Sequence, residues 1–185
     1  MILRGTPRLI LREWRKTDRD LFREINADPK VMEFFPTARS HAESDAALER
    51  INDMIRATGF GFYALELRET AEPIGFCGIA PANLEGIFPL GTMEIGWRLA
   101  TRFWGHGYVT EAAKSMLAMA FDEKKKPEIV SFAVRDNLRS VSVMKRIGLI
   151  RDPSRDFDHP RVPETHPQLK PHVTYALTLE RWLGK

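Results

Sequence analysis

Two glycines, Gly105 and Gly107, stand one residue apart where a strand-like segment gives way to a helix-like one. Residues 92–99 alternate between polar and apolar, which predicts a strand. Apolar residues recur at helical spacing over residues 109–120, which predicts an amphipathic helix. The first N–H groups of a helix lack internal partners and lie at the positive end of its dipole, and glycine lets an anion approach the main chain. The junction therefore predicts a phosphate cradle.

Two familiar phosphate-binding motifs do not fit this junction. The dinucleotide fingerprint G-x-G-x-x-G needs a third glycine where this chain has Thr110, and the P-loop needs a Gly-Lys-Ser/Thr sequence that is absent. The remaining pattern joins Arg102 to the two glycines, and such a triplet arises by chance in roughly a few per cent of chains of this length. Its weight depends on the surrounding sequence.

The composition is that of an ordinary globular protein. With 185 residues, 43% of them hydrophobic and 29% charged, the chain suits a single domain over residues 1–185. The net charge is only +3 and the basic residues are scattered apart from residues 124–126, so no nucleic-acid partner is indicated. Cys77 is the single cysteine, no apolar run is long enough to span a membrane, and the first residues lack a signal-peptide core. We expect a cytoplasmic protein with no membrane partner.

The hydrophobic periodicity predicts a mixed α/β fold of six or seven strands and about four helices. We expect strands at residues 8–14, 61–67, 73–80, 92–99, 128–134 and 172–179. Two helices are expected after capping boxes, one after Thr17 with Asp20 and one after Ser40 with Glu43. Two more are expected from residue 109 and from Asn137 to Gly148, and residues 28–36 are expected to form a helical turn. The strand, helix, strand order around residues 92–134 predicts a parallel pair with a right-handed crossover and a ligand crevice at strand C-termini.

Several motifs together resemble the GNAT N-acetyltransferase superfamily. They are MEIGWRL (residues 93–99), R-x-WGHGY-x-TEA (residues 102–112) and, after an intervening strand, N-x-x-S-x-x-VM-x-R-x-GL (residues 137–149). The opening RLILREW, the block NADPKVMEFFP and the late segment DFDHPRVPETHP are similar to the RimJ/RimL type within that superfamily. The resemblance covers nearly the whole chain.

The resemblance implies a mostly antiparallel sheet with a splayed, parallel central pair, and acetyl-CoA as co-substrate with no metal. Pantetheine would run along the main chain of Trp97, Arg98 and Leu99, and the pyrophosphate would lie on the amides from Arg102 to Tyr108. The full set of expected cofactor residues is Trp97, Arg98, Leu99, Arg102, Gly105, His106, Gly107, Tyr108 and Asn137. For the Arg102 side chain a solvated role is an equal alternative, and for Trp104 packing is the favoured interpretation.

The chemistry that the resemblance implies is attack by an amine on a thioester. An alkylamine with a pKa near ~10 is protonated at pH 7, so a base must take up its proton. Glu94, on the strand face opposite Met93 and Ile95, is the candidate base, and a solvated glutamate or an ion pair with Arg98 are the alternatives. Many relatives supply a tyrosine to protonate the leaving thiolate where this chain has Met144. Ser140 is therefore the second catalytic candidate, with water as the alternative.

The acceptor is the least determined part of this hypothesis. The residues expected to line its pocket are Phe34, Phe35, Asp156, His159 and Tyr175. The spacing of the late histidines matches no zinc pattern, so no metal is expected. The acceptor is either a protein N-terminus or a small-molecule amine. A homodimer is possible, since dimers are common among relatives. Two other function classes stay open: a non-catalytic CoA-binding regulator and a nucleic-acid binder.

Overall fold

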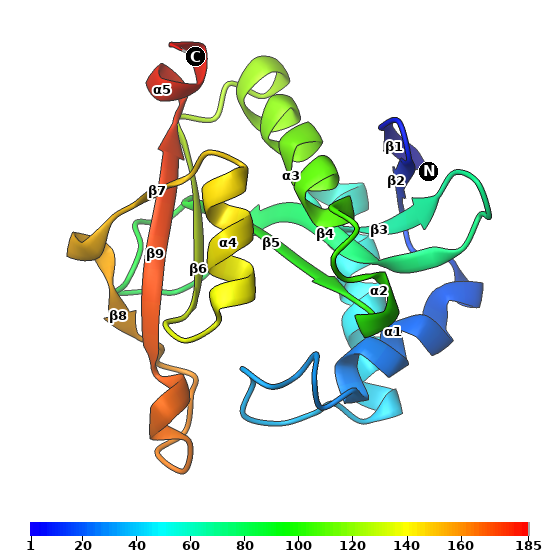
Figure 1. Cartoon of the computed structure of the whole chain (residues 1–185), viewed down its shortest axis with the longest axis horizontal. Helices are drawn as coiled ribbons and strands as arrows, with labels where there is room; N and C mark the ends of the chain where they lie inside the picture. Colours follow the sequence, from blue (N-terminus) through cyan, green and yellow to red (C-terminus); the bar gives the residue numbers. More distant parts are fainter. Residues whose placement is uncertain (185) are drawn as a thin grey trace. The chain divides into compact units, whose positions relative to one another are not determined.

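A computed structural model describes residues 1–184, and these divide into two compact units (Figure 1). The first unit comprises Met1–Ile79 and Gly96–Met116, and the second comprises Ala80–Ile95 and the chain from Leu117 onward. The chain therefore passes between the units at three points, within strand β4, within strand β5 and within helix α3. The single domain over residues 1–185 stays a prediction.

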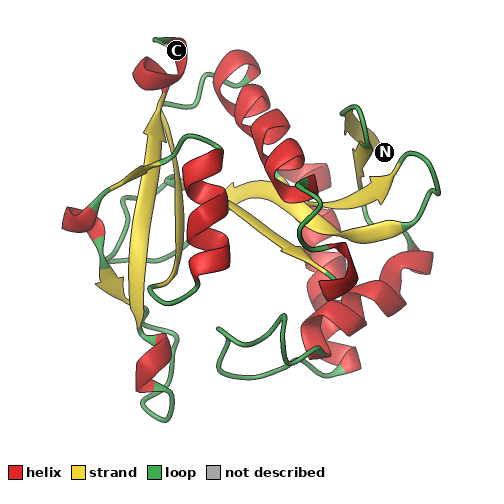
Figure 2. Cartoon of the chain, in the orientation of Figure 1, coloured by secondary structure: helices red, strands yellow, loops and turns green. Residues whose placement is uncertain are grey.

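The secondary structure is a mixture of strands and helices (Figure 2). The strands are β1 (Ile2–Gly5), β2 (Leu9–Arg12), β3 (Gly61–Leu67), β4 (Pro73–Pro81), β5 (Met93–Leu99), β6 (Glu128–Val134), β7 (Ile150–Arg151), β8 (Phe157–Asp158) and β9 (Pro171–Thr178). The α-helices are α1 (Arg19–Ala27), α2 (His41–Thr58), α3 (Tyr108–Ala118), α4 (Leu138–Arg146) and α5 (Leu179–Leu183). A π-helical turn, Met119–Glu123, continues α3.

The strands form one hydrogen-bonded order, β1-β2-β3-β4-β5-β6-β9-β7, with β8 on β9. The pair β5 and β6 is parallel, and the pairs β1–β2, β2–β3, β3–β4, β6–β9, β7–β9 and β8–β9 are antiparallel. The expected mixed, mostly antiparallel sheet is confirmed. Nine strands in the described chain exceed the expected six or seven, because β1, β7 and β8 are too short to show an alternating pattern.

The predicted start of α2 is confirmed, and the predicted start of α1 is wrong. Ser40 and Glu43 form the expected capping box of α2, with the Glu43 N–H donating to Ser40 Oγ at 3.2 Å and the Ser40 N–H donating to Glu43 Oε2 at 2.8 Å. Thr17, by contrast, lies inside a 3-10 turn, and α1 begins two residues later without a side-chain cap. Residues 28–36 form turns, with one helix-like hydrogen bond from the Met32 N–H to Asp28 O at 2.9 Å.

The first unit buries the apolar faces of α1 and α2, which lie beside each other, with α2 also packed on β3 (Figure 1). The Trp14 ring meets the Phe22 ring edge to face at 4.8 Å between centroids, and Phe76 from β4 completes the aromatic group. Leu21, Phe22 and Ile25 of α1 are buried as the periodicity predicts. Burial of each such side chain contributes roughly 1.5–3 kcal/mol.

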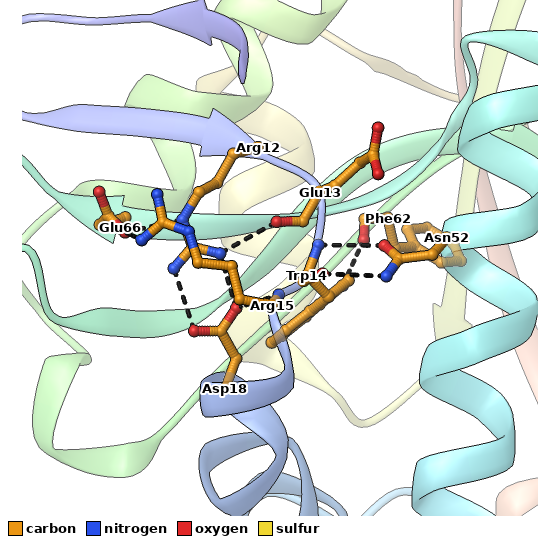
Figure 3. A network of polar contacts seen from close by, with 8 residues as sticks. All are labelled: Arg12, Glu13, Trp14, Arg15, Asp18, Asn52, Phe62 and Glu66. Atoms are coloured by element: carbon orange, nitrogen blue, oxygen red, sulfur yellow. Dashed lines mark hydrogen bonds and ion pairs between the residues drawn. The ribbon is translucent and has the colours of Figure 1, made fainter. Parts of the chain in front are cut away.

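A buried polar network ties β2 to the rest of the first unit (Figure 3). Arg12, only 2% exposed, donates from Nη1 to Asp18 at 2.6 Å and from Nε to Glu66 at 2.7 Å. Arg15 Nη1 donates to Glu66 at 2.7 Å, so two guanidinium groups offset two carboxylates. The Asn52 side chain bonds both the N–H and the C=O of Trp14, at 3.0 and 2.9 Å.

In the second unit, β6 pairs with β9 along its whole length, from Glu128↔Thr178 to Val134↔His172. Helix α4 lies against β6 (Figure 2). A hydrophobic cluster forms around Val130 and Ala176, with Leu84 and Phe88 from the segment between β4 and β5. Phe132 and Phe157 pack against this cluster.

Candidate active site

The glycine turn before α3 has the backbone conformation of an anion cradle. Gly105 and Gly107 have φ values of +82° and +77°, in the left-handed region that favours glycine. The first backbone hydrogen bond of the helix runs from the Glu111 N–H to Gly107 O at 3.1 Å. From Gly105 to Thr110, no backbone N–H donates to another atom of the described chain. The turn therefore presents a row of unpaired donors at the positive end of α3.

Space above the two glycines is open. A Cβ at Gly105 would meet no described atom within 4 Å, and one at Gly107 would meet only the Arg8 guanidinium, at 3.7 Å. Packing therefore does not demand glycine at these positions. The backbone conformation demands it, together with the close approach of any ligand that uses the N–H donors.

An ion pair that the sequence analysis missed holds this turn in place. Glu111, in the first turn of α3, accepts hydrogen bonds from Thr6 Oγ1 at 2.6 Å, from the Arg8 N–H at 2.9 Å and from Arg8 Nε at 2.6 Å. Arg8 Nη1 also donates to the His106 carbonyl at 2.9 Å, and the His106 ring stacks on Tyr108. The only signal in the sequence was an acidic residue in a first helical turn, which is common for helix stability alone.

The side chains of Arg102 and Trp104 have partners within the first unit. Arg102 pairs with Glu24 and lies over the Phe103 ring, with its guanidinium carbon 4.8 Å from the ring centroid. Trp104 Nε1 donates to Leu99 O at 3.0 Å, and the indole packs against the core. The Trp104 contacts agree with the packing role that the sequence analysis favoured.

Glu94 lies on β5 in register with Val130 of β6. Burial raises the pKa of its carboxyl from 4.5 to about 8, against the opposing effect of the Arg161 charge. Among the described residues of its own unit, no hydrogen bond or ion pair engages this carboxylate. A carboxylate with this pKa can take up and release a proton close to neutral pH.

Strands β5 and β6 share a short parallel contact at Glu94. Glu94 and Val130 are its one register pair in the described chain. At the next position the Ser131 hydroxyl donates to the Ile95 carbonyl at 2.9 Å, so the strands are joined there by a side-chain hydrogen bond. The splay of this pair stays a prediction of the resemblance, and Ser131 was not singled out from the sequence.

The start of α4 places Asn137 and Ser140 next to each other. Asn137 Oδ1 accepts a hydrogen bond from the Ser140 N–H at 3.1 Å, which confirms the predicted helix cap. Both side chains are partly buried, and the Ser140 hydroxyl has no hydrogen bond within residues 1–184. Met144, one turn later, is 1% exposed and belongs to the core.

Three residues expected to line the acceptor pocket lie in the second unit with different surroundings. Asp156 pairs with Arg151 and accepts a hydrogen bond from the Thr174 N–H at 3.0 Å. His159 lies 4.8 Å from His172 between ring centroids, and burial together with the positive charges of its neighbours lowers its pKa to about 4. Tyr175 is opposite Ser131 in the ladder, so it projects from the face of the sheet opposite to that of Val130 and Glu94.

The remaining expected pocket residues lie in the first unit, after α1. Phe35 is 43% exposed, and the Arg98 guanidinium lies over its ring at 4.2 Å from the centroid. Phe34 is partly buried. The Arg98 side chain also donates to Asn26 Oδ1.

Other kinds of site find no support in the described chain. Residues 1–184 bring no three His, Cys, Asp or Glu side chains together in a way that could hold a metal ion. Over the same residues, the helices are all too short or too polar to cross a membrane. Cys77 is a buried free thiol, and burial raises its pKa.

Comparisons with known proteins agree with this geometry. The family described as acetyltransferase (GNAT) domain matches residues 8–150. Uncharacterized protein YkkB of Bacillus subtilis (strain 168) is 30% identical over 135 residues, covering 71% of this chain and 77% of that protein. FsC-acetyl coenzyme A-N(2)-transacetylase of Aspergillus fumigatus is 28% identical over 188 residues, covering 96% of this chain and 77% of that protein.

A solved structure shares the fold along almost its whole length. The crystal structure of the acetyltransferase from Agrobacterium tumefaciens str. C58 superposes with a TM-score of 0.75 at 28% identity, covering 96% of this chain and 94% of that one. The chain therefore belongs to the GNAT acetyltransferase family, and it is an acyltransferase.

Proposed function

We propose that this protein transfers an acetyl group from acetyl-CoA to a primary amine, by direct attack in a ternary complex, as a RimJ/RimL-like N-acetyltransferase. The observation that carries the proposal is the row of unpaired N–H groups from Gly105 to Thr110 at the start of α3. Such a row suits a diphosphate, because backbone donors and the helix dipole bind it without a large net charge. The name of the Aspergillus relative, which includes acetyl coenzyme A, supports the same cofactor.

In this proposal the chain holds the co-substrate through its main chain. The amides from Gly105 to Tyr108 bind the pyrophosphate, with Arg102 contributing its backbone. The main chain of Trp97, Arg98 and Leu99 bonds the pantetheine amides, and Asn137 adds a side-chain contact beside its role as helix cap. When bound, acetyl-CoA supplies the thioester carbonyl that the amine attacks.

Glu94 is the proposed base. An alkylamine with a pKa near ~10 arrives protonated at pH 7, and a carboxylate with a pKa of about 8 takes up that proton without a large loss of free energy. The Glu94 carboxylate has no partner among the described residues of its own unit, so its charge is free to interact with an ammonium group. The amine becomes a nucleophile as its proton passes to Glu94 Oε.

The leaving thiolate receives a hydrogen bond from Ser140 or from water. Met144 has no proton to give, and it is buried in the core. The free hydroxyl of Ser140 at the start of α4 is a donor on the same helix. A cytoplasmic location completes the proposal, because a free thiol such as Cys77 is typical of a reducing compartment.

The proposal is tested by measuring thiol release. The protein is incubated with acetyl-CoA and a panel of N-terminal peptides, amino acids, polyamines and aminoglycosides, and free coenzyme A is titrated with a thiol reagent. Thiol release that depends on one class of amine, with the acetylated amine identified by mass spectrometry, is the expected result. If coenzyme A stabilises the fold but no amine releases thiol, the non-catalytic CoA-binding regulator becomes the better explanation.

A further inference from the structure

Arg98 carries a partly buried positive charge that the described chain does not neutralise. Its guanidinium carbon lies 4.2 Å from the Phe35 ring centroid and 5.5 Å from that of Phe76. Its only hydrogen bond within residues 1–184 is to Asn26 Oδ1, although a guanidinium has five N–H donors. Burial, with the positive charge of Arg39 nearby, lowers its pKa to about 10. No carboxylate in the described chain forms an ion pair with it.

Asn26 adds a second unpaired donor to the same place. The residue is 0% exposed in the last turn of α1, and its Nδ2 has no acceptor within residues 1–184. The amide orientation is set by Arg98, because the opposite orientation would bring two donors together. A buried N–H group without an acceptor is costly, so this one calls for an acceptor from outside the chain.

The same unit shows how the fold neutralises a buried arginine when no ligand is needed. Arg12 has carboxylates on both sides, Asp18 and Glu66, and its N–H donors are directed at them (Figure 3). Arg98 has rings and one amide oxygen instead. Buried charges in proteins are usually paired, and Arg98 lacks the carboxylate partners that Arg12 has.

We propose that Arg98 and Asn26 recognise a carboxylate on the acceptor, so that the preferred acceptors are amines that also carry an acid group, such as amino acids. A planar guanidinium binds a carboxylate with two parallel hydrogen bonds, and the Phe35 ring lies against the Arg98 guanidinium. Asn26 Nδ2 supplies a further donor. Polyamines and aminoglycosides are disfavoured, because Arg98 and Arg39 repel additional positive charge. This inference rests on the proposed acetyl transfer to amines.

Paired acceptors test the inference. Glycine, glutamate and a dipeptide are each compared with their carboxamides in the wild type, in Arg98→Gln and in the control Arg56→Gln, which removes an exposed arginine elsewhere in the first unit. We expect Arg98→Gln to reduce the acid-to-amide ratio of kcat/KM by roughly tenfold to a hundredfold, the worth of hydrogen bonds to a charged group. Comparing ratios between variants cancels the different basicity of the paired amines. An unchanged ratio in Arg98→Gln overturns the proposal.

Asn26→Asp provides a second test that does not depend on Arg98→Gln folding well. The new carboxylate lies against the Arg98 guanidinium and takes the place of the acceptor's carboxylate. We expect this variant to lose the acid preference and to melt at a higher temperature than the wild type, because the buried charge gains a counter-charge and the unpaired N–H is gone. An unchanged acid preference, or a lower melting temperature than the wild type, overturns the proposal.

Binding measurements separate this inference from the proposed function. Wild-type protein is titrated with N-acetylglycine and N-acetylglycinamide while the Asn26 side-chain amide signal, assigned from its loss in Asn26→Asp, is followed by NMR. A shift with the acid alone supports the carboxylate site even if no amine is acetylated. If Arg98→Gln weakens coenzyme A binding tenfold and leaves the acid preference intact, the anion belongs to the cofactor and the proposal is wrong.

Discussion

The Glu94 carboxyl makes the free energy of unfolding depend on pH. Replacing Glu94 with glutamine should remove that dependence. Its pKa is raised from 4.5 to about 8 by burial, with Arg161 opposing the rise. Between these two pH values the folded protein binds more protons than the unfolded chain, so the wild type loses stability as pH rises. Glu94→Gln keeps the shape of the side chain but does not titrate, so this loss disappears.

The size of the effect follows from the two pKa values. Each pH unit between them corresponds to ~1.36 kcal/mol, so the interval from 4.5 to about 8 sets an upper limit of roughly 5 kcal/mol. Glu94 is partly exposed, and screening by water reduces this to about 2–3 kcal/mol. The variant and the wild type should be equally stable near pH 4, and the variant should gain its full advantage above pH 8.

Urea unfolding followed by tryptophan fluorescence from pH 4 to pH 9 measures this difference directly. Glu85→Gln, which removes an exposed acid from the same unit, is the matched control and should show no comparable trend. The denaturant dependence of the free energy should be the same in all three proteins. A difference between Glu94→Gln and the wild type that stays constant with pH would show that the carboxyl does not titrate near pH 8.

The same variant tests the proposed role of Glu94 as a base. With a pKa of about 8, roughly a tenth of the Glu94 groups are ionised at pH 7, so wild-type kcat/KM should rise about tenfold towards pH 9. Glu94→Gln should turn over roughly 10²-fold more slowly at pH 7, while coenzyme A affinity stays near that of the wild type. Its rate should keep rising above pH ~9, where the wild type has levelled, because without the base only the neutral fraction of the amine reacts. Equal rates at every pH would exclude Glu94 as the base.

Three further substitutions test the turn, the buried network and the helix cap. Gly107→Val should weaken coenzyme A binding at least tenfold in calorimetry. Gly86 has a similar φ of +78° and also faces open space, so Gly86→Val should lose as much stability as Gly107→Val but bind coenzyme A normally. Equal coenzyme A binding by both variants would show that the phosphate cradle is not at Gly107. Arg12→Met should cost about 3–5 kcal/mol in urea unfolding, because it leaves buried carboxylates without their partner, and a cost below ~1 kcal/mol would contradict this. Asn137→Ala should cost about 1 kcal/mol through the lost cap, and weaker coenzyme A binding in the same variant would reveal its second role.

The sequence by itself determined the elements whose cause lies within a few residues. The Ser40–Glu43 capping box starts α2, and the apolar face of residues 109–120 is buried along α3 and the turn after it. Residues 61–67 and 128–134 form β3 and β6 with the expected bounds. Local hydrogen bonds and side-chain periodicity depend on neighbours along the chain, so the pattern of residues is sufficient to predict them. The glycine turn belongs to this class.

Only the tertiary structure decided which charges are neutralised. In the sequence, Arg12 is one polar residue of an alternating strand and Arg98 is another, and nothing in their spacing distinguishes them. The fold surrounds Arg12 with Asp18 and Glu66, and it places Arg98 beside aromatic rings with only Asn26 as partner. Helix α1 begins after Asp18, whose carboxylate pairs with the buried Arg12, and Thr17 lies inside the preceding 3-10 turn. The free energy of a charge depends on burial and on partners that are distant in the sequence, and those are properties of the folded chain alone.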